Sequence, residues 1–147
     1  MLTKNTFEDA LHDAMRQKDE TAKNTYKILL SSIKMLEIEK GIVADDPIIQ
    51  GILQKEIKMR RESINEFQKG ERADLIELAE TEIALLEKFL PKQMSDEDIK
   101  KAAADAIQET GATLPSDMGK VMKVLVPKLA GQASADRISA AVRSLLS

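Results

Sequence analysis

The sequence predicts an all-α protein, and three observations support this fold class. Charged residues make up 32% of the 147 residues and aromatic residues only 3%, with neither Trp nor Cys, a composition typical of helical proteins. Apolar residues recur at i, i+3, i+4 and i+7, which is the spacing of one face of an α-helix. Capping residues, glycines and prolines separate these periodic stretches, as they do at helix ends.

Four helices are expected in an N-terminal helical domain of residues 1–92. The apolar stripes and their boundaries predict helices over residues 6–17, 21–40, 47–69 and 72–89. Thr6 and Asp46 are residue types that cap helix N-termini, so we expect them to cap the first and third helices. The short connection at Gly70 predicts that the third and fourth helices form a long antiparallel hairpin.

Three shorter helices are expected in a small C-terminal bundle of residues 93–147. Ser95 and Ser134 are expected to cap the first and the last of them. Ser116 is expected to cap the middle helix. That helix should kink or end just before Pro127, because proline has no N–H group and clashes with the preceding turn.

One charged residue lies in the middle of each apolar stripe of the predicted hairpin. Arg60 and Glu82 are equidistant in sequence from the turn at Glu71, so an antiparallel hairpin places them at the same depth, facing each other. We therefore predict a structural ion pair that holds the register of the hairpin. The alternatives are a polar site for a small anion, or side chains that reach solvent without pairing. The stripes themselves are Ile49, Leu53, Ile57, Ile64 and Phe67 on one helix and Leu75, Leu78, Leu86 and Phe89 on the other.

The predicted helix over residues 21–40 has two apolar sides. Its main stripe consists of Ala22, Thr25, Tyr26, Leu29, Ile33 and Leu36. A second group, Ile28, Met35 and Ile38, lies on another side. Two apolar sides indicate that the helix is sandwiched between neighbours or contacts a partner.

Basic residues are concentrated toward the C-terminal end. The net charge is −3, but residues 111–147 contain five basic and two acidic residues, so this end carries +3 and the first 110 residues carry −6. A locally basic end on an acidic protein can bind a polyanion. The candidate nucleic-acid-binding residues are Gly119, Lys120, Lys123, Lys128 and Arg143.

The helix that contains Gly119 is the centre of this candidate site. Its apolar side consists of Met118, Val121, Met122 and Leu125. Lys120 and Lys123 point the opposite way, which fits either contact with an anion or RNA, or a plain solvated face. Gly119 costs about 1 kcal/mol of helix propensity relative to Ala, and such a glycine indicates close approach of another backbone or a ligand. Because no aromatic residue lies nearby to stack on bases, we expect any bound RNA to be recognised by its shape and through its phosphates. Its affinity should then depend strongly on the salt concentration.

No catalytic constellation is recognisable. The single histidine, His12, lies on a charged helix face, and no second His or Cys could complete a zinc site or a thiol dyad. Neither a phosphate-cradling glycine loop nor a nucleophile-elbow motif is present. We therefore expect no catalytic residue, no metal, no cofactor and no independent enzymatic activity. The basic residues around Arg60 alternate with Glu56, Glu62 and Glu66, which we interpret as a solvated, salt-bridged face.

No apolar run is long enough to span a bilayer, and the first residues lack the apolar segment of a secretory signal. We therefore expect a cytoplasmic protein without a membrane partner.

Several short motifs, in order and spacing, resemble those of the GatB/YqeY-like (YqeY) family. They are the opening run 11–19, the Lys-x-Arg motif in 56–63, the turn 70–75, the Leu-Pro-x-Gln linker in 87–93, and the tail signature 117–122 with Pro127-Lys128. The C-terminal part resembles the tail module of the B subunit of transfer-RNA-dependent amidotransferases.

The resemblance implies an all-helical protein in two parts whose C-terminal part contacts transfer RNA. It implies a relation to carbon–nitrogen ligases that use glutamine as amide donor, although no motif for ATP or glutamine is present here. The first hypothesis is thus a transfer-RNA-binding accessory module, possible partners being an aminoacyl-tRNA synthetase or an amidotransferase. The alternative is a protein-interaction module that docks through Ile28, Met35 and Ile38. An amidotransferase-type enzyme in its own right is a third hypothesis, which ranks last. The oligomeric state stays open.

Overall fold

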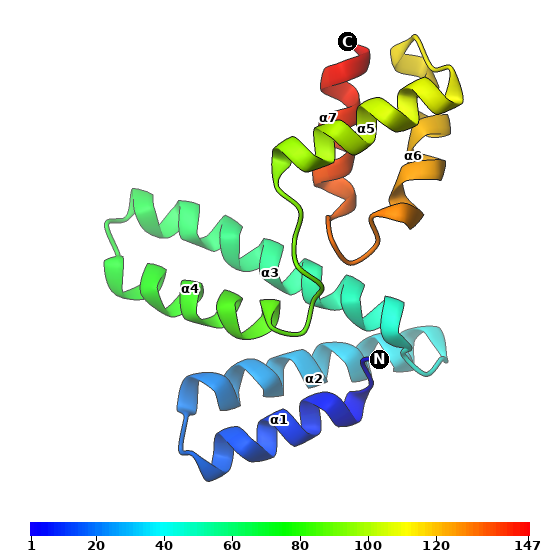
Figure 1. Ribbon diagram of the computed structural model, residues 1–147. Coiled ribbons are helices and arrows are strands. Elements are labelled where there is room, and N and C mark those ends of the chain that lie inside the picture. Colours follow the sequence, from blue (N-terminus) through cyan, green and yellow to red (C-terminus); the bar gives the residue numbers. More distant parts are fainter. The chain divides into compact units, whose positions relative to one another are not determined.

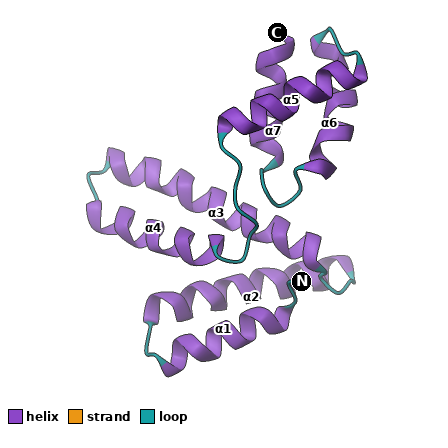
Figure 2. Cartoon of the chain, in the orientation of Figure 1, coloured by secondary structure: helices purple, strands orange, loops and turns teal.

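The computed structural model describes all 147 residues, and its regular structure is entirely helical, with seven α-helices and one short 3-10 helix (Figure 1). Figure 2 shows helices joined by loops, without a strand. The all-α prediction is confirmed. The chain divides into two compact units, Met1–Leu90 and Pro91–Ser147.

The first unit contains two helical hairpins. Helices α1 (Lys4–Arg16) and α2 (Glu20–Lys40) form the first hairpin, and α3 (Asp46–Lys69) and α4 (Ala73–Glu87) form the second. Helix α2 packs against both α3 and α4, so it joins the two hairpins. The fully buried side chains of this core include Phe7, Leu29, Ile33, Ile49, Leu53 and Leu86.

Three aromatic residues pack against one another where α1, α2 and the end of α4 meet. The ring centroids of Phe7 and Phe89 are 4.8 Å apart, and Tyr26 meets Phe89 edge-on at 5.9 Å. Both arrangements are favoured by the quadrupoles of the rings. Burial raises the pKa of the Tyr26 hydroxyl above its ordinary value, and the charge of Asp19 adds to this shift.

Two of the expected helix caps in this unit are wrong by a few residues. Helix α1 begins at Lys4 with Thr3 as its N-cap, and the Thr6 hydroxyl accepts a hydrogen bond from the Thr3 N–H at 3.2 Å. Helix α3 is capped by Asp45, whose carboxylate accepts from the Ile48 N–H at 3.1 Å. At each helix start two polar residues within three positions of each other could serve as the cap, and the choice depends on where the chain enters the helix.

The predicted apolar stripe of α4 is partly wrong. Helix α4 buries Ala79, Ile83 and Leu86, whereas Leu78 is 43% exposed and Leu75 only half-buried. The buried positions of α3 all lie in the half away from the connecting turn, and those of α4 lie from its middle onward, where α2 forms a third layer. Near the turn the two helices have only each other to pack against.

The second unit is a three-helix bundle formed by α5 (Asp96–Thr110), α6 (Met118–Lys128) and α7 (Ala135–Leu146). Each helix contacts the other two around a core of small and aliphatic side chains. The fully buried residues are Ile99, Ala103, Val121, Leu125, Ile138 and Val142. Ser95 and Ser134 cap α5 and α7 as predicted, by accepting from the N–H groups of residues 98 and 137.

The start and end of α6 differ from the prediction. Ser116 lies in a 3-10 helix, Pro115–Asp117, and does not cap α6. The Asp117 carboxylate instead accepts from the N–H groups of Thr113 and Leu114, at 3.0 and 3.1 Å. The helix continues through Pro127 and ends at Lys128, because a proline in the last turn removes only one hydrogen bond.

The residues of the second unit that precede α5 are bonded to the loop between α6 and α7. The Gln93 side-chain amide donates to the carbonyl of Gly131 at 2.8 Å, and the Met94 N–H donates to the carbonyl of Gln132 at 2.9 Å. These bonds fix the start of the second unit to its α6–α7 loop, where Gly131 has a φ of 79°.

Candidate nucleic-acid interface and buried ion-pair network

Helix α6 presents two lysines to solvent on the side opposite its core residues. Val121 and Leu125 are fully buried against α5 and α7, whereas Lys120 and Lys123 are exposed. Neither lysine has a carboxylate oxygen within 4.0 Å of its ammonium, so both charges are available to an external anion. Asp117, one turn before Lys120, interacts with the Lys120 charge electrostatically.

Two other basic residues of the second unit are already paired with carboxylates of α5. The Lys128 ammonium lies 3.3 Å from Glu109, and the Arg137 guanidinium lies 2.7 Å from Asp96 while also donating to the Met94 carbonyl at 2.8 Å. Neither pair could be predicted from the sequence, because the acidic partners lie on a helix that is distant along the chain. The charge of Lys128 is therefore partly neutralised by Glu109, unlike the charges of Lys120 and Lys123.

Arg143 is exposed on α7, and no ion pair forms at its side chain. Helices α6 and α7 run in opposite directions, so the first turn of α6 and the last turn of α7 lie at the same end of the unit (Figure 1). The structure therefore places Gly119, Lys120 and Arg143 toward one end of the bundle, with Lys123 one turn further along α6. Lys128 lies at the opposite end of α6.

Gly119 lies on an open surface. A Cβ atom built on Gly119 would have no heavy atom within 4 Å, so no part of this chain approaches it closely. No other segment of this chain therefore requires a glycine at this position, and close approach of an external backbone or ligand stays a prediction.

Asp117 fixes the approach to α6. The N–H groups of Thr113 and Leu114 stabilise its ionised carboxylate and lower its pKa below the ordinary value, with Lys120 adding a smaller effect. The carboxylate therefore stays charged at neutral pH, and it lies at the start of the helix, where a negative charge is favoured.

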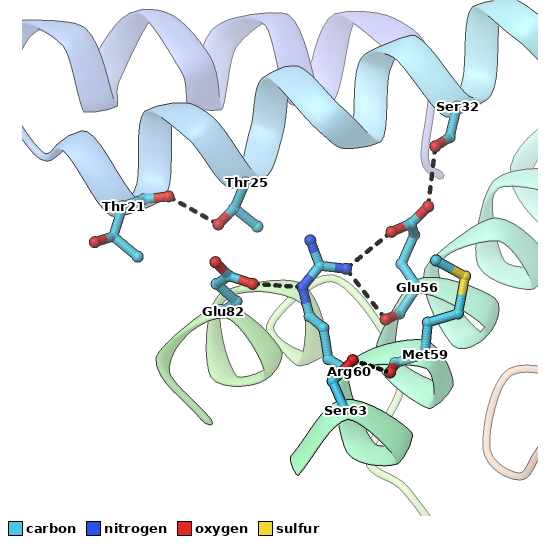
Figure 3. A network of polar contacts seen from close by, with 8 residues as sticks. All are labelled: Thr21, Thr25, Ser32, Glu56, Met59, Arg60, Ser63 and Glu82. Atoms are coloured by element: carbon cyan, nitrogen blue, oxygen red, sulfur yellow. Dashed lines mark hydrogen bonds and ion pairs between the residues drawn. The ribbon is translucent and has the colours of Figure 1, made fainter. Parts of the chain in front are cut away.

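Arg60 and Glu82 meet as the sequence analysis expected, but they belong to a larger buried network (Figure 3). Arg60 Nε donates to Glu82 Oε2 at 2.8 Å. Arg60 Nη1 donates to Glu56 Oε2 at 2.8 Å and to the Glu56 carbonyl at 3.1 Å. The Ser32 hydroxyl donates to Glu56 Oε1 at 2.9 Å, so the network joins α2, α3 and α4.

The interpretation of Glu56 as a solvated residue is wrong. It is only 7% exposed and is the one buried carboxylate of the chain. A signal was present in the sequence, since Glu56 follows Ile49 by seven residues and Leu53 by three, which is the spacing of the buried stripe. Its charge is compensated on both sides, by the Arg60 guanidinium and by the Ser32 hydroxyl, as a buried carboxylate requires. The Nε and Nη1 groups of Arg60 are thus taken up by Glu82 and Glu56, which leaves only Nη2 without a hydrogen bond in the network.

His12 is exposed on α1, and no three His, Asp or Glu side chains converge so that they could hold a metal ion. None of the helices is both long enough and apolar enough to cross a membrane.

The fold and the motifs define a two-unit helical protein with exposed lysines on α6, the last helix but one. Comparison with known proteins gives the family. The model of the Yqey-like protein family matches residues 4–146. This chain belongs to that family, and is a YqeY-domain protein.

Curated relatives come from fungi. An uncharacterized protein of Schizosaccharomyces pombe is 35% identical over 86 residues, which cover 58% of this chain and 70% of that protein. "Altered inheritance of mitochondria protein 41, mitochondrial" of Lachancea thermotolerans is 34% identical over 109 residues, or 72% of this chain and 58% of the relative. The protein of the same name from Clavispora lusitaniae is 31% identical over 123 residues, 82% of this chain and 72% of the relative. The chain thus spans little more than half of some of these relatives.

Proposed function

We propose that this protein is a transfer-RNA-binding accessory module whose second unit contacts the phosphate backbone. The observation that carries the proposal is the exposed pair Lys120 and Lys123, which no carboxylate neutralises while the basic residues Lys128 and Arg137 are paired. Arg143 adds a third free cation toward the same end as Lys120. Gly119, with open space around it, would let a phosphate approach the helix backbone.

The composition of the second unit supports backbone contact over base recognition. Residues 91–147 contain no Phe, Tyr or Trp, so no side chain there can stack on an unpaired base. The same residues include eight basic and seven acidic side chains, a net charge of +1 in a protein of −3. Such a surface suits a folded RNA that is recognised by shape and phosphate position.

The proposed role is accessory because the protein brings no catalytic constellation of its own. Any amide transfer or aminoacylation would take place on a partner, either an amidotransferase or an aminoacyl-tRNA synthetase. The cytoplasm remains the proposed compartment, although the names of several relatives place those proteins in mitochondria.

Binding of the full-length chain to purified transfer RNA, measured by fluorescence anisotropy at several salt concentrations, tests the proposal. If Lys120, Lys123 and Arg143 each neutralise one phosphate, affinity should fall about 40-fold between roughly 50 and 200 mM salt. In the Lys120→Ala/Lys123→Ala variant the same change of salt should lower the residual affinity only about 3-fold.

The matched control is Lys100→Ala/Lys101→Ala, which removes the same charge from two exposed lysines of α5. This control should bind nearly as the unchanged protein does. The proposal fails if the two double variants lose affinity equally, or if the chain does not bind transfer RNA at low salt.

A further inference from the structure

The exposed side of α2 has the spacing of a coiled-coil seam. Ile28, Ser31, Met35 and Ile38 are separated by three, four and three residues, which is the alternation of a and d positions in a heptad. The three apolar members are 50%, 64% and 82% exposed, so the bundle of the first unit leaves this seam without a partner. The core of that unit uses the other side of α2, through Ala22, Tyr26, Leu29 and Ile33.

The surface along this seam contains a recess shaped for a side chain of another helix. Ile28, Ser31, Ser32 and Met35 line a shallow pocket, with Lys27 at its edge. These four residues stand at i, i+3, i+4 and i+7, the diamond that forms the hole in knobs-into-holes packing. Small serines at the centre and longer side chains at both ends make the site concave. The hydrogen bond that Ser32 donates to Glu56 of α3 fixes the position of its side chain.

The charges beside the seam indicate which helix would fit. Lys27 and Lys34 occupy the g positions when Ile28 and Met35 are assigned to a, and the e positions hold Ser32 and Glu39, so the seam is flanked by two positive charges and one negative charge. Both lysines are exposed, and neither forms an ion pair with a carboxylate of this chain. Because residues at e and g choose the partner by charge, a helix with acidic side chains beside its apolar seam would be attracted.

We propose that this α2 seam docks an amphipathic helix of another protein, with aliphatic side chains in its seam and acidic residues beside it. A second copy of this chain is a poorer occupant, because an antiparallel two-fold contact would set the g-position lysines of the two seams against each other, and each seam offers only Glu39 as an acidic flank. A lipid surface fits less well too, because the site is concave and has no aromatic anchor. The proposal does not depend on RNA binding, which concerns the other unit.

The test uses a synthetic, fluorescently labelled helical peptide of about three heptads, with Leu at a and d and Glu at e and g. The uniform negative charge keeps the peptide from pairing with itself. The full-length protein should bind it with a dissociation constant that changes little with the Lys120→Ala/Lys123→Ala substitutions. A peptide with Lys in place of every Glu should bind at least about tenfold more weakly.

Protein variants make the experiment decisive. Ile28→Asp should abolish binding, whereas Leu78→Asp on α4, a similarly exposed position, should not. Lys27→Glu/Lys34→Glu should reverse the preference toward the Lys-flanked peptide. The seam residues are exposed, so each variant should show the circular dichroism and the thermal unfolding of a folded protein.

Three results would overturn the proposal. The first is no binding of the Glu-flanked peptide, or binding that is indifferent to the sign of its flanks. The second is a dimer in sedimentation equilibrium that Ile28→Asp dissociates, which would assign the seam to a second copy. The third is flotation with vesicles of phosphatidylcholine and phosphatidylserine that is lost in Ile28→Asp, which would assign the seam to a lipid surface.

Discussion

Removing Arg60 should destabilise the first unit more than removing the whole network. The side chains of Arg60 and Glu56 are only 11% and 10% exposed, and that of Glu82 is 24% exposed. Arg60→Met would leave two carboxylates facing each other, with Ser32 as the single remaining donor to Glu56. Breaking a buried pair in this way costs about 3–5 kcal/mol, because the remaining charge is uncompensated.

Replacing all three charged residues should restore most of that loss. Glu56→Leu/Arg60→Met/Glu82→Leu removes every buried charge and leaves apolar side chains of similar size. Apolar replacements of buried ionic groups are often neutral or stabilising, so this variant should lie within about 1 kcal/mol of the unchanged protein. Glu82→Ala alone should cost about 1–2 kcal/mol, because Arg60 keeps its bonds to Glu56.

The unfolding of the first unit can be measured separately from that of the second by tyrosine fluorescence. Tyr26 is the single tyrosine, is buried in the first unit, and the protein has no tryptophan. Tyrosine fluorescence during urea unfolding therefore follows that unit, while circular dichroism follows both. If Arg60→Met and the triple variant lose the same free energy of unfolding, the ionic network does not behave as a compensated unit and the reasoning is refuted.

Two further predictions concern Glu37 and Gly119. The Glu37 carboxylate accepts from Lys4 at 2.8 Å and from the Ala44 N–H at 2.7 Å, and these bonds lower its pKa below 4.5. A lowered pKa stabilises the fold above the ordinary pKa and loses that effect as the pH falls through the lowered value. The unchanged protein should therefore have a higher free energy of unfolding than Glu37→Gln, measured by tyrosine fluorescence in urea, and this difference should shrink in acid. A difference that stays constant with pH would show that the carboxylate charge is not its source. Gly119→Ala should raise the free energy of unfolding of the second unit by about 0.5–1 kcal/mol, because alanine favours the helix and its added methyl group clashes with no other segment. It should also weaken transfer-RNA binding, and an unchanged affinity would remove Gly119 from the interface.

Part of the candidate site could be predicted from the sequence. The exposure of Lys120 and Lys123 follows from the position of the α6 apolar stripe, and the meeting of Arg60 with Glu82 follows from hairpin symmetry. The pairing of Lys128 with Glu109 could not be predicted. It depends on how α5 and α6 are rotated against each other, which the helical period of one segment does not contain.

The sequence by itself determined the helices, most of their ends and the antiparallel α3–α4 hairpin. These features depend on contacts within a few residues, such as a serine cap, a glycine of positive φ or a short connection. Only the tertiary structure decided that Glu56 is buried, that Leu78 is exposed and that the α2 seam has no partner within its bundle. Each of these depends on which helix lies across from a given residue, and that choice is made by the packing of the whole unit.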